Sequence, residues 1–175
     1  QGGKVDGTVY GGGLAVGQAY VATNAGSSYA DSKADVGKST IQLVAGEVTG
    51  DIVAGGVNDV ADGTHGSAEV AEADITIWNG FTVGGNISGA GAKTADLTFV
   101  NGIDLTKSDD TSTTVSFFDT LTATGGEAKG FDYDATGKEN VSVLGDAAVS
   151  ISKLTNLTGA MSVGKEGKTG FLGVT

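Results

Sequence analysis

Five short segments of the chain share one pattern of residues: polar, apolar, polar, apolar, apolar. Alternation with a period of two predicts strands with one buried and one exposed face, and the β-branched and aromatic content of these segments agrees. Sustained helical periodicity is not found in the sequence, although a helical turn within residues 66–74 stays open as an alternative. The predicted strands are TIQLV at 40–44, DITIW at 74–78, DLTFV at 96–100, TVSFF at 114–118 and NVSVL at 140–144.

A glycine-rich phrase recurs three times and predicts tight corners. In each copy a glycine precedes an apolar residue by two positions. We expect the apolar residue to fill a narrow core and the glycine to turn the chain between sheets, because glycine adopts backbone conformations that other residues rarely reach. The copies are KVDGTVYGGG (4–13, with Gly7 and Val9), EVTGDIVAGG (47–56, with Gly50 and Ile52) and TVGGNISGAG (82–91, with Gly85 and Ile87).

The spacing of the repeats favours a stack of coils. The predicted strands begin at 40, 74, 96, 114 and 140, so successive starts lie 34, 22, 18 and 26 residues apart. Steps near 20 residues fit one coil of a β-solenoid, and longer steps fit a coil with a projecting loop, here at 14–35 and 57–73. We predict an all-β fold: a parallel β-solenoid (β-helix) of about eight short coils with Gly and Asn-Gly corners. It forms a single domain over residues 1–175, with the clearest repeats in 1–126 and looser coils in 127–175.

An antiparallel arrangement is the alternative. Asn79-Gly80 follows one predicted strand, and Asn-Gly between apolar strands is the strongest short signal for a β-hairpin. In that interpretation DITIWNGFTVGG is a hairpin, and the fold is an antiparallel β-sandwich or meander. The sequence alone leaves both arrangements open.

The composition excludes several classes of partner. The net charge is −11 and every basic residue is a lysine, so the chain lacks arginine for phosphate recognition and repels nucleic acid and anionic membranes. No run of about 18 apolar residues is present that would span a bilayer as a helix. The absence of cysteine excludes disulfides and thiolate chemistry. We therefore expect no binding to nucleic acid and no membrane insertion by this chain.

The repeats resemble those of bacterial autotransporter passengers and of related large glycine-rich surface adhesins. The resemblance implies a right-handed parallel β-solenoid that is secreted and displayed on the bacterial cell surface as an adhesin or aggregation factor. The repeats of this family are scaffold, so no ligand residues carry over. The runs that carry the resemblance are VDGTVYGGG, VAGEVTGDIVAGG, NGFTVGGNISGAG, ADLTFVNG and SFFDTLTATGG, and they cover most of residues 4–126.

Residues suited to catalysis are sparse. His65 is the single histidine, so a histidine metal pair is excluded, and its context DGTHGS indicates a solvated loop. Some parallel β-helices cleave polysaccharides with paired carboxylates, but no Asp or Glu stands out in the sequence from ordinary surface charge. We therefore expect a non-enzymatic protein without a required cofactor.

A calcium site is the one metal hypothesis that the sequence supports. Asp132, Asp134 and Thr136 occupy alternate positions before Gly137, like the first half of a loop with oxygen ligands. The second half is missing, because the twelfth position of such a loop is Val143 where a bidentate glutamate would be needed. A solvated acidic turn is the alternative.

Aromatic residues divide into core and contact candidates. Trp78, Phe99, Phe117 and Phe118 occupy the late apolar positions of the strand pattern, where core packing explains them without a ligand, and a core position is preferred for the three phenylalanines. Candidates for contact with a carbohydrate or a protein are Trp78, which ends a strand, and Tyr10, Tyr20 and Tyr29, which lie near glycine-rich loops.

Two functions fit these observations. The first is an extracellular or cell-surface adhesion module whose Ser/Thr-rich, acidic sides bind glycans, other surface proteins or another copy of the chain. The second is a filament subunit that polymerises by β-strand addition or end-to-end stacking, because the terminal segments QGGKV and GFLGVT lack charged or proline caps.

Overall fold

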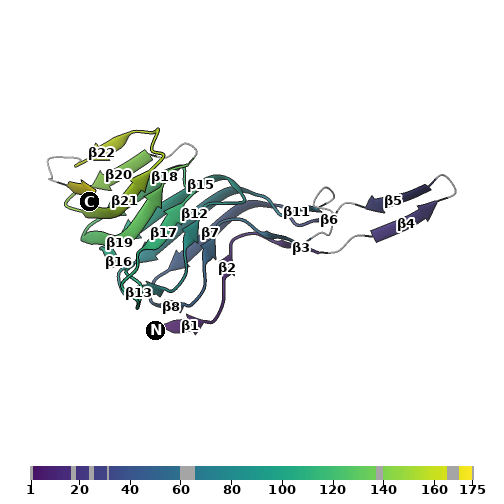
Figure 1. The fold of residues 1–175 in the computed structure, drawn as a ribbon, viewed down its shortest axis with the longest axis horizontal. Coiled ribbons are helices and arrows are strands. Elements are labelled where there is room, and N and C mark those ends of the chain that lie inside the picture. Colours follow the sequence, from purple (N-terminus) through teal and green to yellow (C-terminus); the bar gives the residue numbers. More distant parts are fainter. Residues whose placement is uncertain are drawn as a thin grey trace.

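The computed structural model describes residues 2–16, 19–23, 26–30, 32–59, 66–136, 140–164 and 170–174, and for 19–23 and 26–30 it describes the backbone alone. All regular structure in these ranges is β-strand, and most strands pair in parallel (Figure 1). The all-β prediction is therefore confirmed. Within the described residues there is no helix long and apolar enough to cross a membrane.

Three parallel sheets make up the main body: up to residue 100 the chain visits all three in turn, and after that it alternates between the two larger ones. It passes, for example, from β8 through β9 to β12, and then from β13 through β14 to β15. The sheets are β1-β8-β13, β22-β20-β18-β15-β12-β7, and β2-β9-β14-β17-β19-β21-β23, with β16 pairing with β19 in the third. The first comprises β1 (Gly3–Val5), β8 (Gly46–Val48) and β13 (Phe81–Val83). The second comprises β7 (Val36–Leu43), β12 (Val70–Trp78), β15 (Ala92–Val100), β18 (Thr120–Thr124), β20 (Asn140–Leu144) and β22 (Met161–Val163). The third comprises β2 (Val9–Tyr10), β9 (Ile52–Val53), β14 (Ile87–Ser88), β16 (Ile103–Asp104), β17 (Thr113–Ser116), β19 (Glu127–Asp134), β21 (Ala148–Thr155) and β23 (Phe171–Val174).

The core consists of aligned apolar columns between the sheets. In the six-stranded sheet, Ile75 pairs in register with Leu97, and Leu97 with Leu121, and all three are at most 1% exposed. In the eight-stranded sheet, Ile52 pairs with Val9 on one side and with Ile87 on the other. The predicted alignment of the three glycine phrases is therefore confirmed.

Close backbone contact explains the glycines of these phrases better than turning does. Gly7 has a φ of 126°, whereas Gly50 and Gly85 do not adopt positive φ. A Cβ atom on Gly50 would lie 2.6 Å from the carbonyl carbon of Gly7, and one on Gly85 would lie 2.5 Å from that of Gly50. The glycines do stand at the corners, but there they let successive backbones touch, and the Gly85 N–H donates to the Gly50 carbonyl at 3.0 Å.

The antiparallel alternative is wrong for residues 74–85. Strand β12 pairs in parallel with β7 and β15, and β13 pairs in parallel with β8, so Asn79-Gly80 joins strands of two different sheets. The possible helical turn within 66–74 is also wrong, because β11 (Gly66–Ser67) and the start of β12 occupy that range. Tertiary pairing decides the outcome in both places, since the local sequence allowed either structure.

One of the five predicted strands lies in a different sheet from the other four. Residues 114–118 overlap β17 of the eight-stranded sheet, and Phe117 has a φ of 61° and is 48% exposed, so its predicted core position is wrong. Phe99 and Phe118 are buried as predicted. The fourth strand of the six-stranded sheet is instead β18, whose inward Ala123 lies opposite Phe99 and gave little apolar signal.

Two predicted loops form an arm that projects from the stack (Figure 1). The described residues of 14–35 lie in the arm, whereas the last part of 57–73 belongs to β12. Among the described residues, one large sheet has six strands and the other has seven in succession, so the chain makes slightly fewer turns than the eight coils expected. The arm contains β3 (Leu14–Val16) paired in parallel with β10 (Val57–Asp59), β6 (Ser32–Lys33) paired in parallel with β11, and the antiparallel hairpin of β4 (Ala19–Thr23) and β5 (Gly26–Ala30).

Candidate functional site

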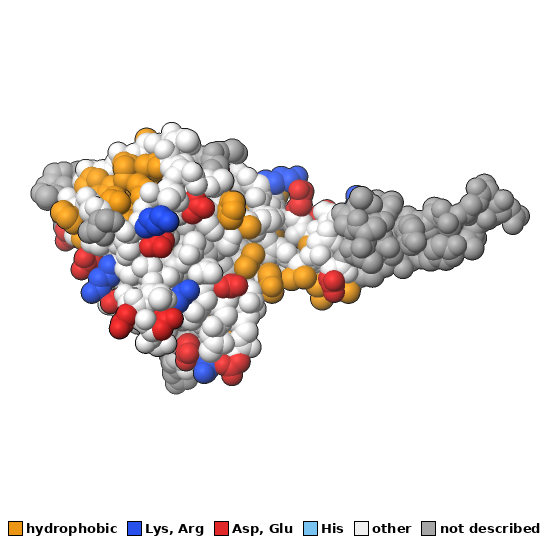
Figure 2. Space-filling model, in the orientation of Figure 1, with side chains coloured by type: hydrophobic (Ala, Val, Ile, Leu, Met, Phe, Trp, Pro, Cys, Tyr) orange, Lys and Arg blue, Asp and Glu red, His pale blue; other side chains and the backbone are white. Residues whose placement is uncertain are grey.

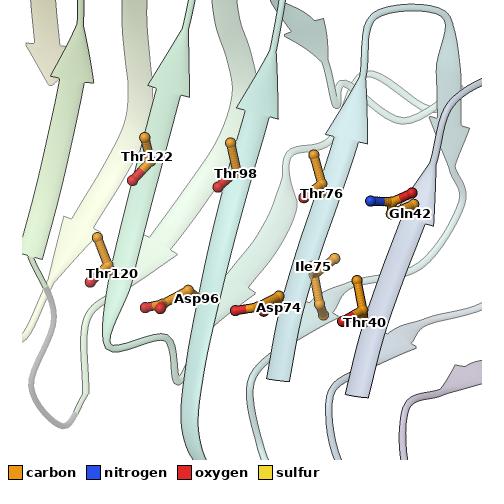
Figure 3. A pocket seen from close by; sticks show the side chains of 9 residues that line it. All are labelled: Thr40, Gln42, Asp74, Ile75, Thr76, Asp96, Thr98, Thr120 and Thr122. Atoms are coloured by element: carbon orange, nitrogen blue, oxygen red, sulfur yellow. The ribbon is translucent and has the colours of Figure 1, made fainter. Parts of the chain in front are cut away.

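The outer surface of the six-stranded sheet carries two straight rows of polar side chains, which we call the polar face (Figure 3). The rows arise because each strand alternates inward and outward residues and neighbouring strands pair without a shift in register. The two rows border a shallow open groove of about 390 Å³. The first row is Thr40, Asp74, Asp96, Thr120 and Asn140, and the second is Gln42, Thr76, Thr98, Thr122, Ser142 and Ser162.

A lysine neutralises one of the two carboxylates in the first row. Lys38 Nζ lies 2.8 Å from Asp74 Oδ2 and 3.6 Å from Glu72 Oε2. The hydrogen bond and the charge of Asp74 raise the pKa of Lys38, so this lysine stays protonated at neutral pH. Because all three side chains are solvent-exposed to a large extent, the pairing contributes little to stability and mainly sets the local charge.

Asp96 sits in the least favourable electrostatic position of the polar face. Partial burial raises its pKa, a hydrogen bond with Thr120 opposes the rise, and the charges of Asp74 and Asp119 add to it. The Asp119 carboxylate accepts a hydrogen bond at 2.9 Å from the backbone N–H of Ala95 and so has a structural task. Of the two carboxylates that line the groove, Asp74 forms a direct ion pair with Lys38, whereas the charge of this lysine has only a minor lowering effect on the pKa of Asp96.

A third row, which we call the Trp78 row, runs beside the polar face. Trp78 pairs in register with Val100, Val100 with Thr124, and Thr124 with Leu144. These four side chains are all partly exposed, and Trp78 follows the same outward alternation as Asp74 and Thr76. The candidate Trp78 therefore lies next to the second polar row. Its partners in the row, Val100, Thr124 and Leu144, form a partly apolar strip beside that row.

The three tyrosine candidates lie elsewhere. Tyr10 is 47% exposed on β2, in a different sheet from the polar face. Tyr20 and Tyr29 are register partners in the hairpin of the arm, where the structure describes the backbone alone. The structure thus does not bring the tyrosines together with Trp78.

The central residue of the calcium hypothesis, Asp134, is held by protein donors. Asp134 Oδ1 accepts hydrogen bonds from Thr136 Oγ1 and Asn156 Nδ2, each at 2.8 Å, and from Thr155 Oγ1 at 3.3 Å. These bonds, led by that of Asn156, hold the pKa of Asp134 below its usual value. Asp132 lies two residues earlier on β19, in register with Lys153.

Parts of the predicted sites fall beyond what the structure describes. Gly137 in the proposed calcium loop and the single histidine, His65, lie outside the described residues. Among the residues that are described, no group of three or more His, Asp or Glu side chains is arranged to hold a metal ion. The calcium hypothesis stays a prediction.

The polar face itself was not singled out from the sequence, although its signal was present. Its residues are the polar positions of the same repeated strand pattern, among them Thr76 and Thr98, which served there only as evidence of alternation. The pattern specifies that these side chains point outward, but their alignment into rows follows from the register between distant strands.

No protein-family model, curated protein or solved structure matches the chain. The resemblance to autotransporter passengers therefore stays a prediction. The geometry by itself offers a surface rather than an enclosed pocket: rows of hydroxyl, amide and carboxylate groups that exchange hydrogen bonds with a partner laid across several strands.

Proposed function

We propose that the protein is a non-enzymatic adhesion module displayed outside the cell, and that its polar face contacts the surface to which it adheres. The observation that carries the proposal is the pair of polar rows that continues across the six-stranded sheet. A long row of similar groups suits contact with an extended partner, because every strand repeats the same kind of contact.

The scaffold that we propose for this module is a parallel β-solenoid. Up to β15 the chain returns to the three main sheets in the same order, and from β16 on it alternates between the two larger sheets, with parallel pairing throughout. Such a scaffold suits adhesion, since it is elongated and gives one side chain per strand in each row. Display on a bacterial surface is supported by the glycine-rich β-strand repeats, which resemble those of autotransporter passengers. A net charge of −11 favours solubility outside the cell.

The test compares two lysine substitutions that differ in the sheet on which they stand. Thr98→Lys places a long charged side chain in the middle of the second polar row, whereas Thr114→Lys places one on the exposed side of β17 in the other large sheet. Beads coated with each protein are passed over epithelial cells and over layers of purified polysaccharide, and attached beads are counted.

We expect Thr98→Lys to reduce attachment strongly and Thr114→Lys to leave it unchanged, with both proteins folded by circular dichroism. Equal attachment of the two variants would contradict the assignment of the polar face. Attachment no greater than that of beads coated with an unrelated acidic protein would contradict the adhesive function.

A second candidate, a subunit that polymerises end to end, is favoured by the two ends of the stack. Apolar side chains gather over the C-terminal strands (Figure 2), where Met161 is 41% and Phe171 is 61% exposed. At the opposite end, Val5 is 47% exposed. Met161 belongs to the same column as Ile41 of β7, so a second copy stacked in register would place these two side chains side by side.

Sedimentation over a hundredfold concentration range, with negative-stain images of the same samples, tests this second candidate. Polymerisation predicts rods that grow with concentration and that Met161→Lys shortens, because the charge would enter the contact between copies. A monomer at every concentration would leave the adhesion module as the proposal.

A further inference from the structure

We propose that the polar face binds an uncharged polysaccharide, with the sugar hydroxyls on the two polar rows and the apolar faces of the sugar rings against Trp78. This proposal rests on the adhesive function proposed above and names the chemical class of the ligand. It follows from three properties of the surface: its hydrogen-bonding groups, its apolar border and its charge.

The hydrogen-bonding groups suit a partner that both donates and accepts. Hydroxyl groups such as that of Thr98 donate one hydrogen bond and accept others, and the amide of Gln42 does both. The same holds for every hydroxyl group of a sugar. Neighbouring strands place such groups about 4.8 Å apart, and the two rows lie about 7 Å apart along each strand. A polyhydroxylated chain that crosses the strands therefore meets a usable partner at each strand.

The Trp78 row gives the surface a second, apolar side. Trp78 and Val100 are register partners, and Trp78 stands two residues from Thr76 on the same side of β12. A sugar ring is apolar on its C–H face and polar at its rim, and tryptophan contributes a large rigid apolar area at binding surfaces at little cost in conformational entropy. The combination of a polar row with an adjacent aromatic residue therefore matches a sugar ring better than a partner that is polar throughout.

The charges on the polar face favour an uncharged polysaccharide over charged partners. Asp96 would repel anionic polysaccharides, and a second copy docked face to face would bring a second Asp96 carboxylate to the same surface, where like charges cost several kcal/mol. A basic protein would find one carboxylate in the groove to pair with, that of Asp96, because Lys38 already pairs with Asp74. An uncharged polysaccharide meets neither obstacle.

The chain carries its own reporter for this binding, because Trp78 is its single tryptophan. We would titrate the protein with dextran, mannan and xylan as uncharged polysaccharides, with polygalacturonate as an anionic one and with polylysine as a basic polymer, following tryptophan fluorescence. We expect at least one uncharged polysaccharide to shift the emission, with an affinity that changes less than about twofold between low and high salt, because no ion pair is broken.

Two matched pairs of variants locate the contact. Thr98→Val removes a hydroxyl from the polar face and keeps the shape of the side chain, whereas Thr114→Val does the same on the other large sheet. We expect Thr98→Val to weaken binding about three- to tenfold, the effect of one hydrogen bond, and Thr114→Val to leave it unchanged. By affinity electrophoresis, Trp78→Ala should weaken binding at least about tenfold, whereas Phe117→Ala, at an exposed aromatic residue on another surface, should not.

The results that would contradict the polysaccharide proposal differ from those that would contradict the adhesive function. Tighter binding of polygalacturonate or polylysine than of the uncharged polysaccharides, or equal effects of Thr98→Val and Thr114→Val, would overturn the ligand class. If bead attachment still depended on Thr98 in that case, the adhesive role of the polar face would stand with a different partner. If bead attachment ignored Thr98 as well, both proposals would fail.

Discussion

Replacing Gly50 by alanine should destabilise the protein, although alanine is normally the more favourable residue. The new Cβ atom would lie 2.6 Å from the carbonyl carbon and 2.7 Å from the carbonyl oxygen of Gly7, both of which are backbone atoms. Ordinary contacts begin at 3.4 Å, so the two corners must separate by about 0.8 Å (3.4 − 2.6). Gly85 packs against the other side of Gly50 and limits that movement.

The expected size follows from two opposing effects. Forcing an extra methyl group into a packed site costs about 1–3 kcal/mol, and the lower entropy of the unfolded alanine chain returns about 0.4–1 kcal/mol. The net loss of about 1–2 kcal/mol corresponds to a fall in Tm of roughly 2–8 °C for a chain of this length.

Thermal melts and urea unfolding followed by circular dichroism measure the effect, and Gly37→Ala is the matched control. Gly37 lies in β7 with no atom within 4 Å of an added Cβ and with no positive φ, so its alanine variant should be at least as stable as the parent. Equal midpoints for Gly50→Ala and Gly37→Ala would refute the reasoning that backbone contact, and not only turning, requires glycine at the corner.

Three further substitutions test the core and the charges. Ile75→Asp should unfold the protein, since a buried unpaired carboxylate costs roughly 3–5 kcal/mol, whereas Thr76→Asp on the outer side should not; a normal melt for Ile75→Asp would show that the register is wrong. The pKa of Asp96 is raised in the folded protein, so its stabilising contribution is present below the usual value of 3.8 and is lost as pH rises through the raised pKa. Asp96→Asn should therefore raise the Tm at pH 7 and give no such gain near pH 3. A lower Tm of the variant at pH 7 would contradict this. For Asp134 the pKa is lowered, so its contribution is present above 3.8 and is lost as pH falls through the lowered pKa, and Asp134→Asn should reduce the Tm at pH 7 but not at strongly acidic pH. Because Asp134 Oδ1 already accepts three hydrogen bonds, about 1 mM calcium should leave the Tm unchanged, and a calcium-dependent rise abolished by Asp134→Asn would establish the calcium site instead.

The sequence predicted the strands well where the alternation was strong. The alternating apolar positions of DITIW and DLTFV are buried, namely Ile75, Ile77, Leu97 and Phe99, and the corner glycines lie where the repeated phrase predicted them. The pattern failed where an inward position holds a small residue, as at Ala123, or where an apolar residue lies at a turn, as at Phe117.

The candidate site was predicted less well, for a physical reason. Outward threonines carry no local signal of function, because Thr76 and Thr98 lie 22 residues apart in the chain (98 − 76) and become neighbours only through the pairing of β12 with β15. Trp78 was recognised as a contact candidate, but the sequence could not show that it borders those threonines. Register between strands is a tertiary property, and it decides which side chains form a surface.

The polar face exists only if β12 and β15 run in parallel and in register, and disulfide formation measures this directly. The chain has no cysteine, so within one molecule each of two introduced cysteines has only the other as a disulfide partner. Thr76 and Thr98 are register partners, whose Cα atoms at about 4.8 Å fall within the range that a disulfide spans. A hairpin at Asn79-Gly80 would instead place Thr76 opposite Val83. Under mild oxidation, Thr76→Cys with Thr98→Cys should form an intramolecular disulfide, and Thr76→Cys with Val83→Cys should not. A disulfide in the second pair alone would contradict the parallel pairing of the strands and, with it, the polar face.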